Sequence, residues 1–253
     1  MNVGLVIAAV GGGFAAGTMN AVVGAGSLVS FPALLAAGVP ALTANVSNTI
    51  GLLPGSLSAV HGYRRELAGR RHTLVRLCVA GGLGGLTGGL LLLAFPSSTF
   101  EAVVPFLLVL AGILTALQPT VSRRLAEHPS ASPHGGPLLL VLVGLTGVYG
   151  GYFGAAQGVI LLALLGVFLE SDVQRANAVK NLVALVVNVV AGILFALRAD
   201  VDWGVAALLA LGALAGGTTG VRVARRLPPA AFRWFVVLVA ITAAVAISVK
   251  EVG

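Results

Sequence analysis

Long runs of apolar residues, interrupted by short polar breaks, extend over almost the whole chain. Because the runs are continuous and lack the period-two alternation of membrane β-strands, we predict helices. Five runs precede a polar stretch in the middle of the chain and five follow it: 3–19, 21–37, 44–63, 74–94, 102–118, 137–153, 154–170, 176–197, 204–224 and 233–249. A membrane-crossing helix needs about 20 residues. The first two runs of each half are shorter, and we expect them to be short, tilted or re-entrant.

The composition excludes a soluble protein. Hydrophobic residues make up 58% of the chain and charged residues 9%, with a mean hydropathy of +1.03, whereas soluble domains carry about 25% charged residues. The net charge of +7 does not indicate nucleic-acid binding, since the basic residues fall in short loops, where they orient membrane proteins. The expected class is therefore an all-α polytopic membrane protein in a lipid bilayer. The single Cys78 lies in an apolar run and excludes an intramolecular disulfide.

The two halves of the sequence resemble each other at an offset of 132 residues. Gly26 corresponds to Gly158 and Asn45 to Asn177, and a GGxTG block at 84–88 recurs at 216–220. A fixed spacing sustained over several motifs indicates an internal duplication. The predicted organisation is an N-terminal transmembrane repeat (1–118), a cytoplasmic linker (119–136) and a C-terminal transmembrane repeat (137–253).

Charge places equivalent loops on opposite sides of the membrane. Thirteen of the fifteen Lys and Arg residues lie in four places that a single topology assigns to the cytoplasm, as the positive-inside rule requires. The arginine-rich loop near residue 70 then corresponds to a loop near 200 that contains Asp200 and Asp202. We therefore expect inverted repeats, a plan that recurs in secondary transporters with substrate sites at broken helices near the midplane.

Breaks in the second run of each half are the first candidate for a site. Gly24, Gly26 and Ser27 interrupt one run, and Gln157 and Gly158 interrupt its counterpart. If the two turns meet, their free N–H groups and helix N-termini would suit an anion. The alternative is close packing, because small residues let helices approach each other. Packing is the favoured interpretation for the later glycines, Gly84, Gly85, Gly88, Gly216, Gly217 and Gly220.

Polar residues at the start of the third run in each half are the second candidate. They are Asn45, Asn48 and Thr49 in the first half, and Asn177, Lys180 and Asn181 in the second. Lys180 is the first choice as a cationic partner for an anion, since an ionisable group in a membrane segment is a functional candidate. Alternatively, Lys180 extends to the interface and the asparagines hold helices together. The predicted substrate-binding residues are Gly24, Gly26, Ser27, Asn45, Asn48, Thr49, Gln157, Gly158, Asn177, Lys180 and Asn181.

Sequence features of enzymes are missing. The chain has no HExxH, GxSxG or Walker motif, and its four histidines have no metal-ligand spacing. No carboxylate lies deep within an apolar run, which argues against a cation site built from buried acids. We expect no enzymatic activity, no cofactor and no metal.

Two stretches carry a resemblance to a known family. They are GGGFAAGTMNAVVGAGSLVSFPALLAAGVPALTANVSNTIGLLPGSLSAVHGYRRE in the first half, and GVYGGYFGAAQGVILLALLGVF followed by ANAVKNLVALVVN in the second. Their order and spacing resemble the TauE/SafE sulfite exporter family. The resemblance implies a permease of the bacterial cytoplasmic membrane for sulfite, sulfonates or related organic anions. The sequence GAGS at the first turn and Gln157 at the second depart from the family pattern and leave the substrate open.

The expected function is therefore a secondary transporter that moves a small anion by alternating access. An anion channel and a non-transporting membrane scaffold or assembly factor are the alternatives. The expected partners are a small anionic substrate and the lipid bilayer. The oligomeric state stays open, with a homodimer as one option.

Overall fold

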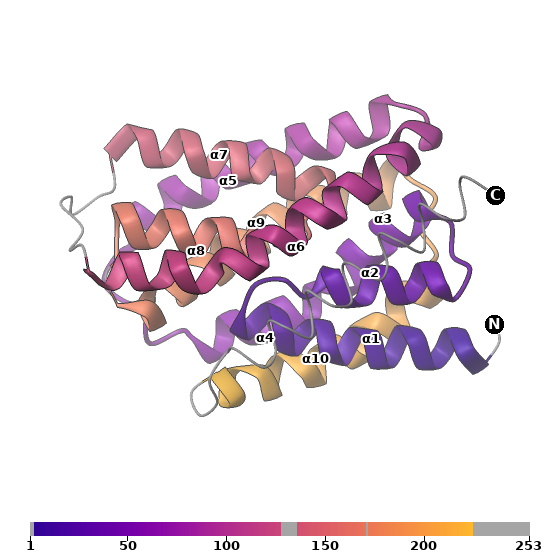
Figure 1. Cartoon of the computed structure of the whole chain (residues 1–253), viewed down its shortest axis with the longest axis horizontal. Helices are drawn as coiled ribbons and strands as arrows, with labels where there is room; N and C mark the ends of the chain where they lie inside the picture. Colours follow the sequence, from indigo (N-terminus) through magenta and orange to yellow (C-terminus); the bar gives the residue numbers. More distant parts are fainter. Residues whose placement is uncertain (1–2, 128–135, 171, 225–253) are drawn as a thin grey trace.

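The structure, a computed structural model, describes residues 3–127, 136–170 and 172–224, and every regular element within these ranges is helical (Figure 1). The predicted tenth run, 233–249, lies outside the described residues. In chain order the helices are α1 (Val3–Val22), α2 (Ser27–Ala36), α3 (Ala41–Gly51), α4 (Leu53–Gly62), α5 (Arg71–Ala94), α6 (Ser97–Glu127), α7 (Gly136–Tyr152), α8 (Gln157–Phe168), α9 (Val173–Arg198) and α10 (Trp203–Ala224).

Helix lengths confirm the membrane class. Five helices, α1, α5, α6, α9 and α10, are long and apolar enough to cross a membrane. Helices α2 and α8 have only 10 and 12 residues, about 15 and 18 Å at 1.5 Å per residue. Since the hydrocarbon core is about 30 Å thick, each spans roughly half of it. The second run of each half is therefore short, as expected.

Two boundaries differ from the sequence-based prediction. The run at 44–63 forms two helices, α3 and α4, which meet at Leu52. Pro54 lies at the start of α4, where its missing N–H and fixed φ are compatible with a helix beginning but not with a helix interior. The polar linker expected at 119–136 is also shorter, because α6 continues to Glu127 and α7 begins at Gly136.

Each half contains a helical hairpin with a buried turn. Helix α2 packs antiparallel against α1, with Gly26 beside Ala16 and Gly12 beside Ser30, and α8 packs on α7 in the same way. In Figure 1, α1 and α7 begin at opposite ends of the long axis, as do α5 and α10. The second run of each half therefore returns toward the end of the molecule at which its hairpin started.

Glycine faces bring two pairs of helices into close contact. Helix α1 packs in parallel on α10, and α5 packs in parallel on α7. A Cβ added to Gly220 would lie 2.8 Å from the carbonyl oxygen of Thr18, and one added to Gly88 would lie 2.8 Å from the backbone nitrogen of Tyr152. Such small-residue contacts are typical of membrane helices, in which van der Waals packing drives association. The structure agrees with the packing interpretation of these glycines.

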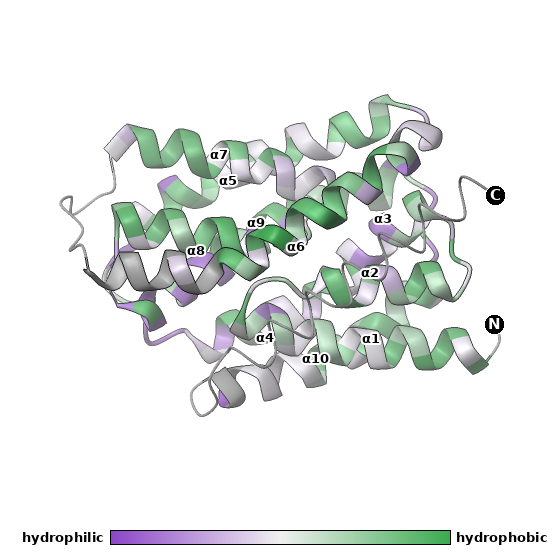
Figure 2. Cartoon of the chain, in the orientation of Figure 1, coloured by the Kyte–Doolittle hydropathy of each residue, from purple (hydrophilic) through white to green (hydrophobic). Residues whose placement is uncertain are grey.

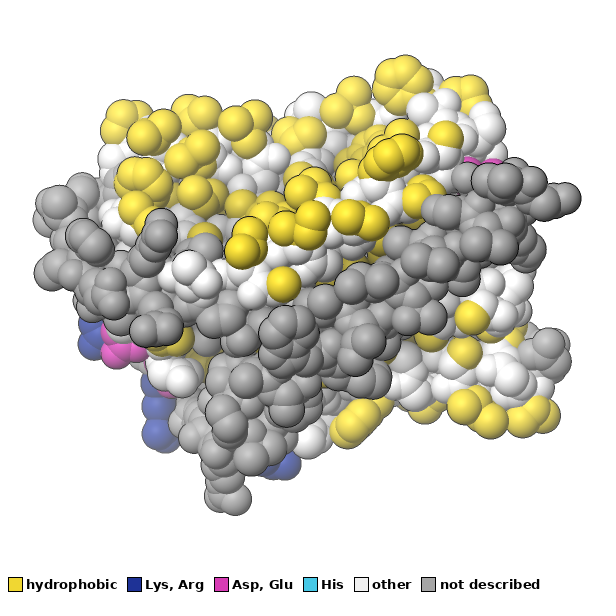
Figure 3. Space-filling model, in the orientation of Figure 1, with side chains coloured by type: hydrophobic (Ala, Val, Ile, Leu, Met, Phe, Trp, Pro, Cys, Tyr) yellow, Lys and Arg dark blue, Asp and Glu magenta, His cyan; other side chains and the backbone are white. Residues whose placement is uncertain are grey.

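The outer surface is apolar along the helices and carries charged residues at both ends, such as Arg71 at one and Asp200 at the other. Leu83, Phe106 and Leu197 are 62%, 75% and 74% exposed, and hydrophobic side chains cover much of the face formed by α5, α6 and α7 (Figure 3). Hydropathy follows the same division, with hydrophilic residues concentrated at helix ends and breaks (Figure 2). Apolar side chains of this kind are stable in contact with acyl chains, so this surface is suited to a lipid bilayer.

Candidate functional site

The turns of the two hairpins are in direct contact. The N–H of Gly158 donates to the carbonyl oxygen of Gly24 at 3.2 Å. A Cβ on Gly24 would lie 2.7 Å from the Cα of Gly158, so neither position has room for a side chain. Gly24 adopts a φ of +83°, and Ala156, which corresponds to it at the 132-residue offset, also has positive φ (+59°). The two breaks therefore share a backbone conformation that L-residues rarely adopt.

Several backbone amides at these turns have hydrogen-bond partners. Gly24 N–H donates to Met19 O at 2.9 Å and Gln157 N–H to Gly154 O at 3.3 Å. Gly26 N–H donates to Asn20 Oδ1 at 2.7 Å. These three amides and that of Gly158 are therefore not free, and anion binding by the remaining N–H groups at the breaks stays a prediction. Gly24 and Gly158 serve the close approach of the hairpins.

Lys180 points into the protein from α9. It is 1% exposed, and its ammonium group donates to the carbonyl oxygen of Asn20 at 3.3 Å. A lysine that extended to the interface would expose its amine, so that alternative does not describe this structure. Among the described residues the single ion pair joins Arg70 and Glu170, and Lys180 has no carboxylate partner.

Three buried amide side chains each have a polar atom without a hydrogen-bond partner in the described part of the chain. Two of them lie close to Lys180 in the sequence, and the third lies at the hairpin contact. Asn177 and Asn181 lie three residues before and one after Lys180 and are each 7% exposed, while Gln157 is 2% exposed. Asn177 Oδ1, Asn181 Nδ2 and Gln157 Nε2 are buried and have no hydrogen-bond partner in the described part of the chain. A buried polar atom without a partner costs about 1–3 kcal/mol, so each of these three atoms requires an explanation, of which an ordered water and a bound ligand are two.

The corresponding polar residues of the first half are satisfied. Asn48 Oδ1 accepts a hydrogen bond from Ser30 at 2.5 Å, and Asn48 Nδ2 donates to Ser27 Oγ at 3.2 Å. Asn45 Nδ2 donates to the carbonyl oxygen of Tyr152 at 3.1 Å, which links α3 to the other hairpin. Thr49 hydrogen-bonds back to Asn45 O within its own helix. Asn45 and Asn48 therefore hold α3 against neighbouring helices in this structure, and the unsatisfied amides described above lie on the second half.

Two hydrogen bonds that join the halves have acceptor residues that correspond to each other at the 132-residue offset. Asn45 donates to Tyr152 and Lys180 donates to Asn20, while Tyr152 corresponds to Asn20 and Lys180 to Asn48. Each hairpin thus offers a carbonyl at the end of its first helix to a side chain from the opposite half. Asn20 was not among the sequence candidates. Its signal was a polar residue four positions before the GAG break, in an otherwise apolar run.

Helical hairpins with interrupted turns that meet in the interior recur in secondary transporters, and the described fold is of that kind. The comparisons with known proteins identify the family. The profile of the sulfite exporter TauE/SafE family matches residues 9–247, so the chain belongs to this family. It is a multi-pass membrane protein, consistent with the bacterial cytoplasmic membrane.

Similar proteins carry transporter names. The chain is 29% identical over 211 residues to the "Probable membrane transporter protein ORF9" of Sinorhizobium sp., covering 83% of this chain and 80% of that protein. It is 26% identical over 208 residues to the "Probable membrane transporter protein YfcA" of Escherichia coli K12, covering 82% and 76%. A "Probable membrane transporter protein" of Haemophilus influenzae is 26% identical over 211 residues, covering 83% and 81%. No solved structure matches the chain.

Proposed function

We propose that the protein is a secondary transporter of a small anion, such as sulfite, a sulfonate or a related organosulfur anion, and that Lys180 binds it. The observation that carries the proposal is the burial of the Lys180 ammonium group without a described counter-ion. A buried charge is strongly disfavoured unless it is paired. An anionic substrate would supply the missing charge.

Buried amide side chains of α8 and α9 would suit the same anionic ligand. An ammonium group has three donors, of which Asn20 O accepts one. Gln157 Nε2 and Asn181 Nδ2 add donors that are unused within the described residues. An oxyanion presents several acceptor oxygens, and hydrogen bonds to charged groups are worth about 1.5–3 kcal/mol each. The described carboxylate that is buried, Glu170, already binds Arg70 and does not compete for Lys180.

Alternating access between inverted halves is the proposed mechanism. Helices that correspond at the 132-residue offset, α1 with α7 and α5 with α10, begin at opposite ends of the molecule (Figure 1). Opposed repeats allow one arrangement to be exchanged for its counterpart about a pseudo-two-fold axis in the membrane plane, which would open the site to the other side. The hairpin contact between Gly24 and Gly158 lies beside Asn20 and would take part in that exchange.

The experiment uses the purified full-length chain. Thermal-shift assays with sulfite, thiosulfate, sulfonates and carboxylates first select an anion that raises the apparent stability. Its flux is then measured in proteoliposomes for the native protein, Lys180→Gln and Arg175→Gln. Arg175 is an exposed residue of the same helix and serves as the matched control. We expect Lys180→Gln to weaken binding about 10–100-fold, the loss of one charged hydrogen bond, and Arg175→Gln to retain it.

Two alternative functions give different results. An anion channel would conduct the same anion but show no counterflow, in which an internal unlabelled anion drives uptake of a labelled one. A scaffold would show no flux, and its Lys180→Gln variant would be folded and unchanged in every anion assay. Either pattern would contradict the proposal.

A further inference from the structure

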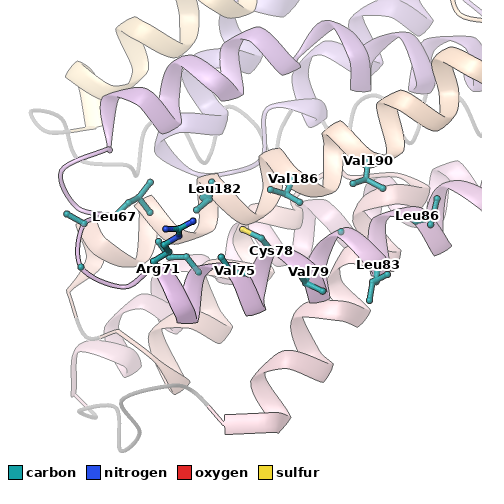
Figure 4. A pocket seen from close by; sticks show the side chains of 14 residues that line it. Leu67, Arg71, Val75, Cys78, Val79, Leu83, Leu86, Leu182, Val186 and Val190 are labelled. Carbon is teal, nitrogen blue, oxygen red and sulfur yellow. The ribbon is translucent and has the colours of Figure 1, made fainter.

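A long apolar groove runs along the outer face of the protein between α5 and α9. It has a volume of about 840 Å³ and is lined from α5 by Val75, Val79 and Leu83 and from α9 by Val186 and Val190. Figure 4 shows these side chains in a row between the two helices, with Leu86 near one end and Arg71 near the other. The groove is separate from the hairpin contact that holds the proposed anion site.

The dimensions of the groove match one leaflet of a bilayer. Arg71 and Leu86 are fifteen residues apart on α5, which corresponds to about 22 Å along the helix. Half of the hydrocarbon core measures about 15 Å. The groove is therefore long enough for the chain of a lipid that starts at the interface and ends near the midplane.

The end of the groove at the start of α5 carries a positive charge, on Arg71, that has no ion-pair partner among the described residues. Arg71 is exposed at the first residue of α5, and the structure shows no ion pair for it among the described residues. Its neighbour Arg70 binds Glu170 and is not free. An arginine at a helix N-terminus is a favourable place for a phosphate, because the guanidinium group and the helix dipole act together.

The corresponding face of the other half has different residues. At the 132-residue offset, Gly82 is replaced by Leu214 and Arg71 by Trp203. Leu214 is 48% exposed. A Cβ on Gly82 would contact Val186 at 3.4 Å and Val190 at 3.7 Å, so the glycine forms part of the floor and a leucine there would fill the groove. The exposed arginine and the glycine floor therefore occur together on α5 and are both absent at the corresponding positions of α10.

We propose that this groove binds one anionic phospholipid, with an acyl chain along α5 and α9 and its phosphate on Arg71. The apolar lining excludes a soluble polar ligand, and the charge complementarity at Arg71 selects an acidic headgroup over a zwitterionic one. The site does not depend on the transported anion.

Native mass spectrometry of the purified full-length chain tests the proposal. Phosphatidylglycerol and phosphatidylcholine with identical acyl chains are titrated into the detergent solution. We expect one phosphatidylglycerol to be retained in preference to phosphatidylcholine. Arg71→Gln should reduce this preference about fivefold, the effect of one basic residue near an anionic surface. Arg76→Gln, an exposed arginine of the same helix outside the groove, should keep it.

A pair of glycine variants tests the location. Gly82→Leu should remove the retained lipid, whereas Gly11→Leu should keep it, because Gly11 is exposed on α1 with nothing within 4 Å of an added Cβ. Retention that survives Gly82→Leu in a folded protein overturns the proposal. So does a native dimer that Gly82→Leu converts to a monomer, since the groove would then be an interface between two copies.

Discussion

The ammonium group of Lys180 donates a hydrogen bond to the carbonyl oxygen of Asn20, 160 residues earlier in the chain, at 3.3 Å. Asn20 belongs to the last turn of α1, where carbonyl groups lack helical partners and the helix dipole is negative. The broken end of α1 thereby compensates part of the buried charge. The remaining charge is what an anion would neutralise.

Replacing Lys180 by methionine should stabilise the protein without ligand. Methionine has a similar volume and needs no counter-charge, and exchanging a buried ion for an apolar side chain is often neutral or stabilising by about 1–4 kcal/mol. The anion-dependent rise in melting temperature should disappear. Both effects are measured by thermal unfolding with and without the selected anion. A variant that is less stable but still responds to the anion would exclude Lys180 as the binding group.

Replacing an amide that lacks a hydrogen-bond partner should affect stability and anion binding differently from replacing an amide that has partners. Asn181→Leu removes an atom that has no described partner, so we expect a stability loss below about 1 kcal/mol and a weaker response to the anion. Asn48→Leu leaves the buried Ser30 hydroxyl without its acceptor, which should cost about 1–3 kcal/mol. Chemical denaturation and anion titration of both variants separate the two roles. Equal effects on binding would show that the first half also contacts the substrate.

The hairpin contact should tolerate no added methyl group. Gly158→Ala would place a Cβ 2.6 Å from the Cα of Gly24, and overpacking of this kind typically costs about 1–3 kcal/mol. Gly38→Ala is the control for backbone strain alone, since Gly38 has a φ of +88° but open space around it. Gly24→Ala combines both costs and should be the least stable of the three. The measurement is the free energy of unfolding; a Gly158→Ala variant as stable as the native protein would contradict the close approach.

The inverted arrangement predicts that equivalent loops are labelled from opposite sides. Because Cys78 is the single cysteine, Cys78→Ser provides a background for Arg65→Cys and Asp200→Cys, both at exposed positions. A membrane-impermeant thiol reagent applied to intact cells should modify position 200 and leave position 65 unmodified until the membrane is opened. Modification of both positions from the same side would rule out inverted repeats.

The sequence was sufficient for the helices whose apolar runs are long, such as α5, α9 and α10. The break at Leu52 was missed because the run around it stays apolar, although Pro54 was a visible signal. Lys180 could be selected because charge inside an apolar run is rare. Asn20 could not, since its role depends on a contact with α9 that no local pattern encodes. The breaks at Gly24 and Gly158 were recognised, but the hydrogen-bond partners that occupy their amides arise only from the folded hairpins.

The parallel packing of α1 on α10 and of α5 on α7 exchanges partners between the two sequence repeats. The first helix of each repeat packs against a helix of the other repeat, so a repeat synthesised alone would leave the glycine-rich face of that helix uncovered. Helices of the two sequence repeats therefore pack against each other, and under the proposed alternating access the bodies that shift would each be composed of helices from both. A chain severed in the central connection should become functional when both fragments are produced in one cell, and remain inactive when either is produced separately.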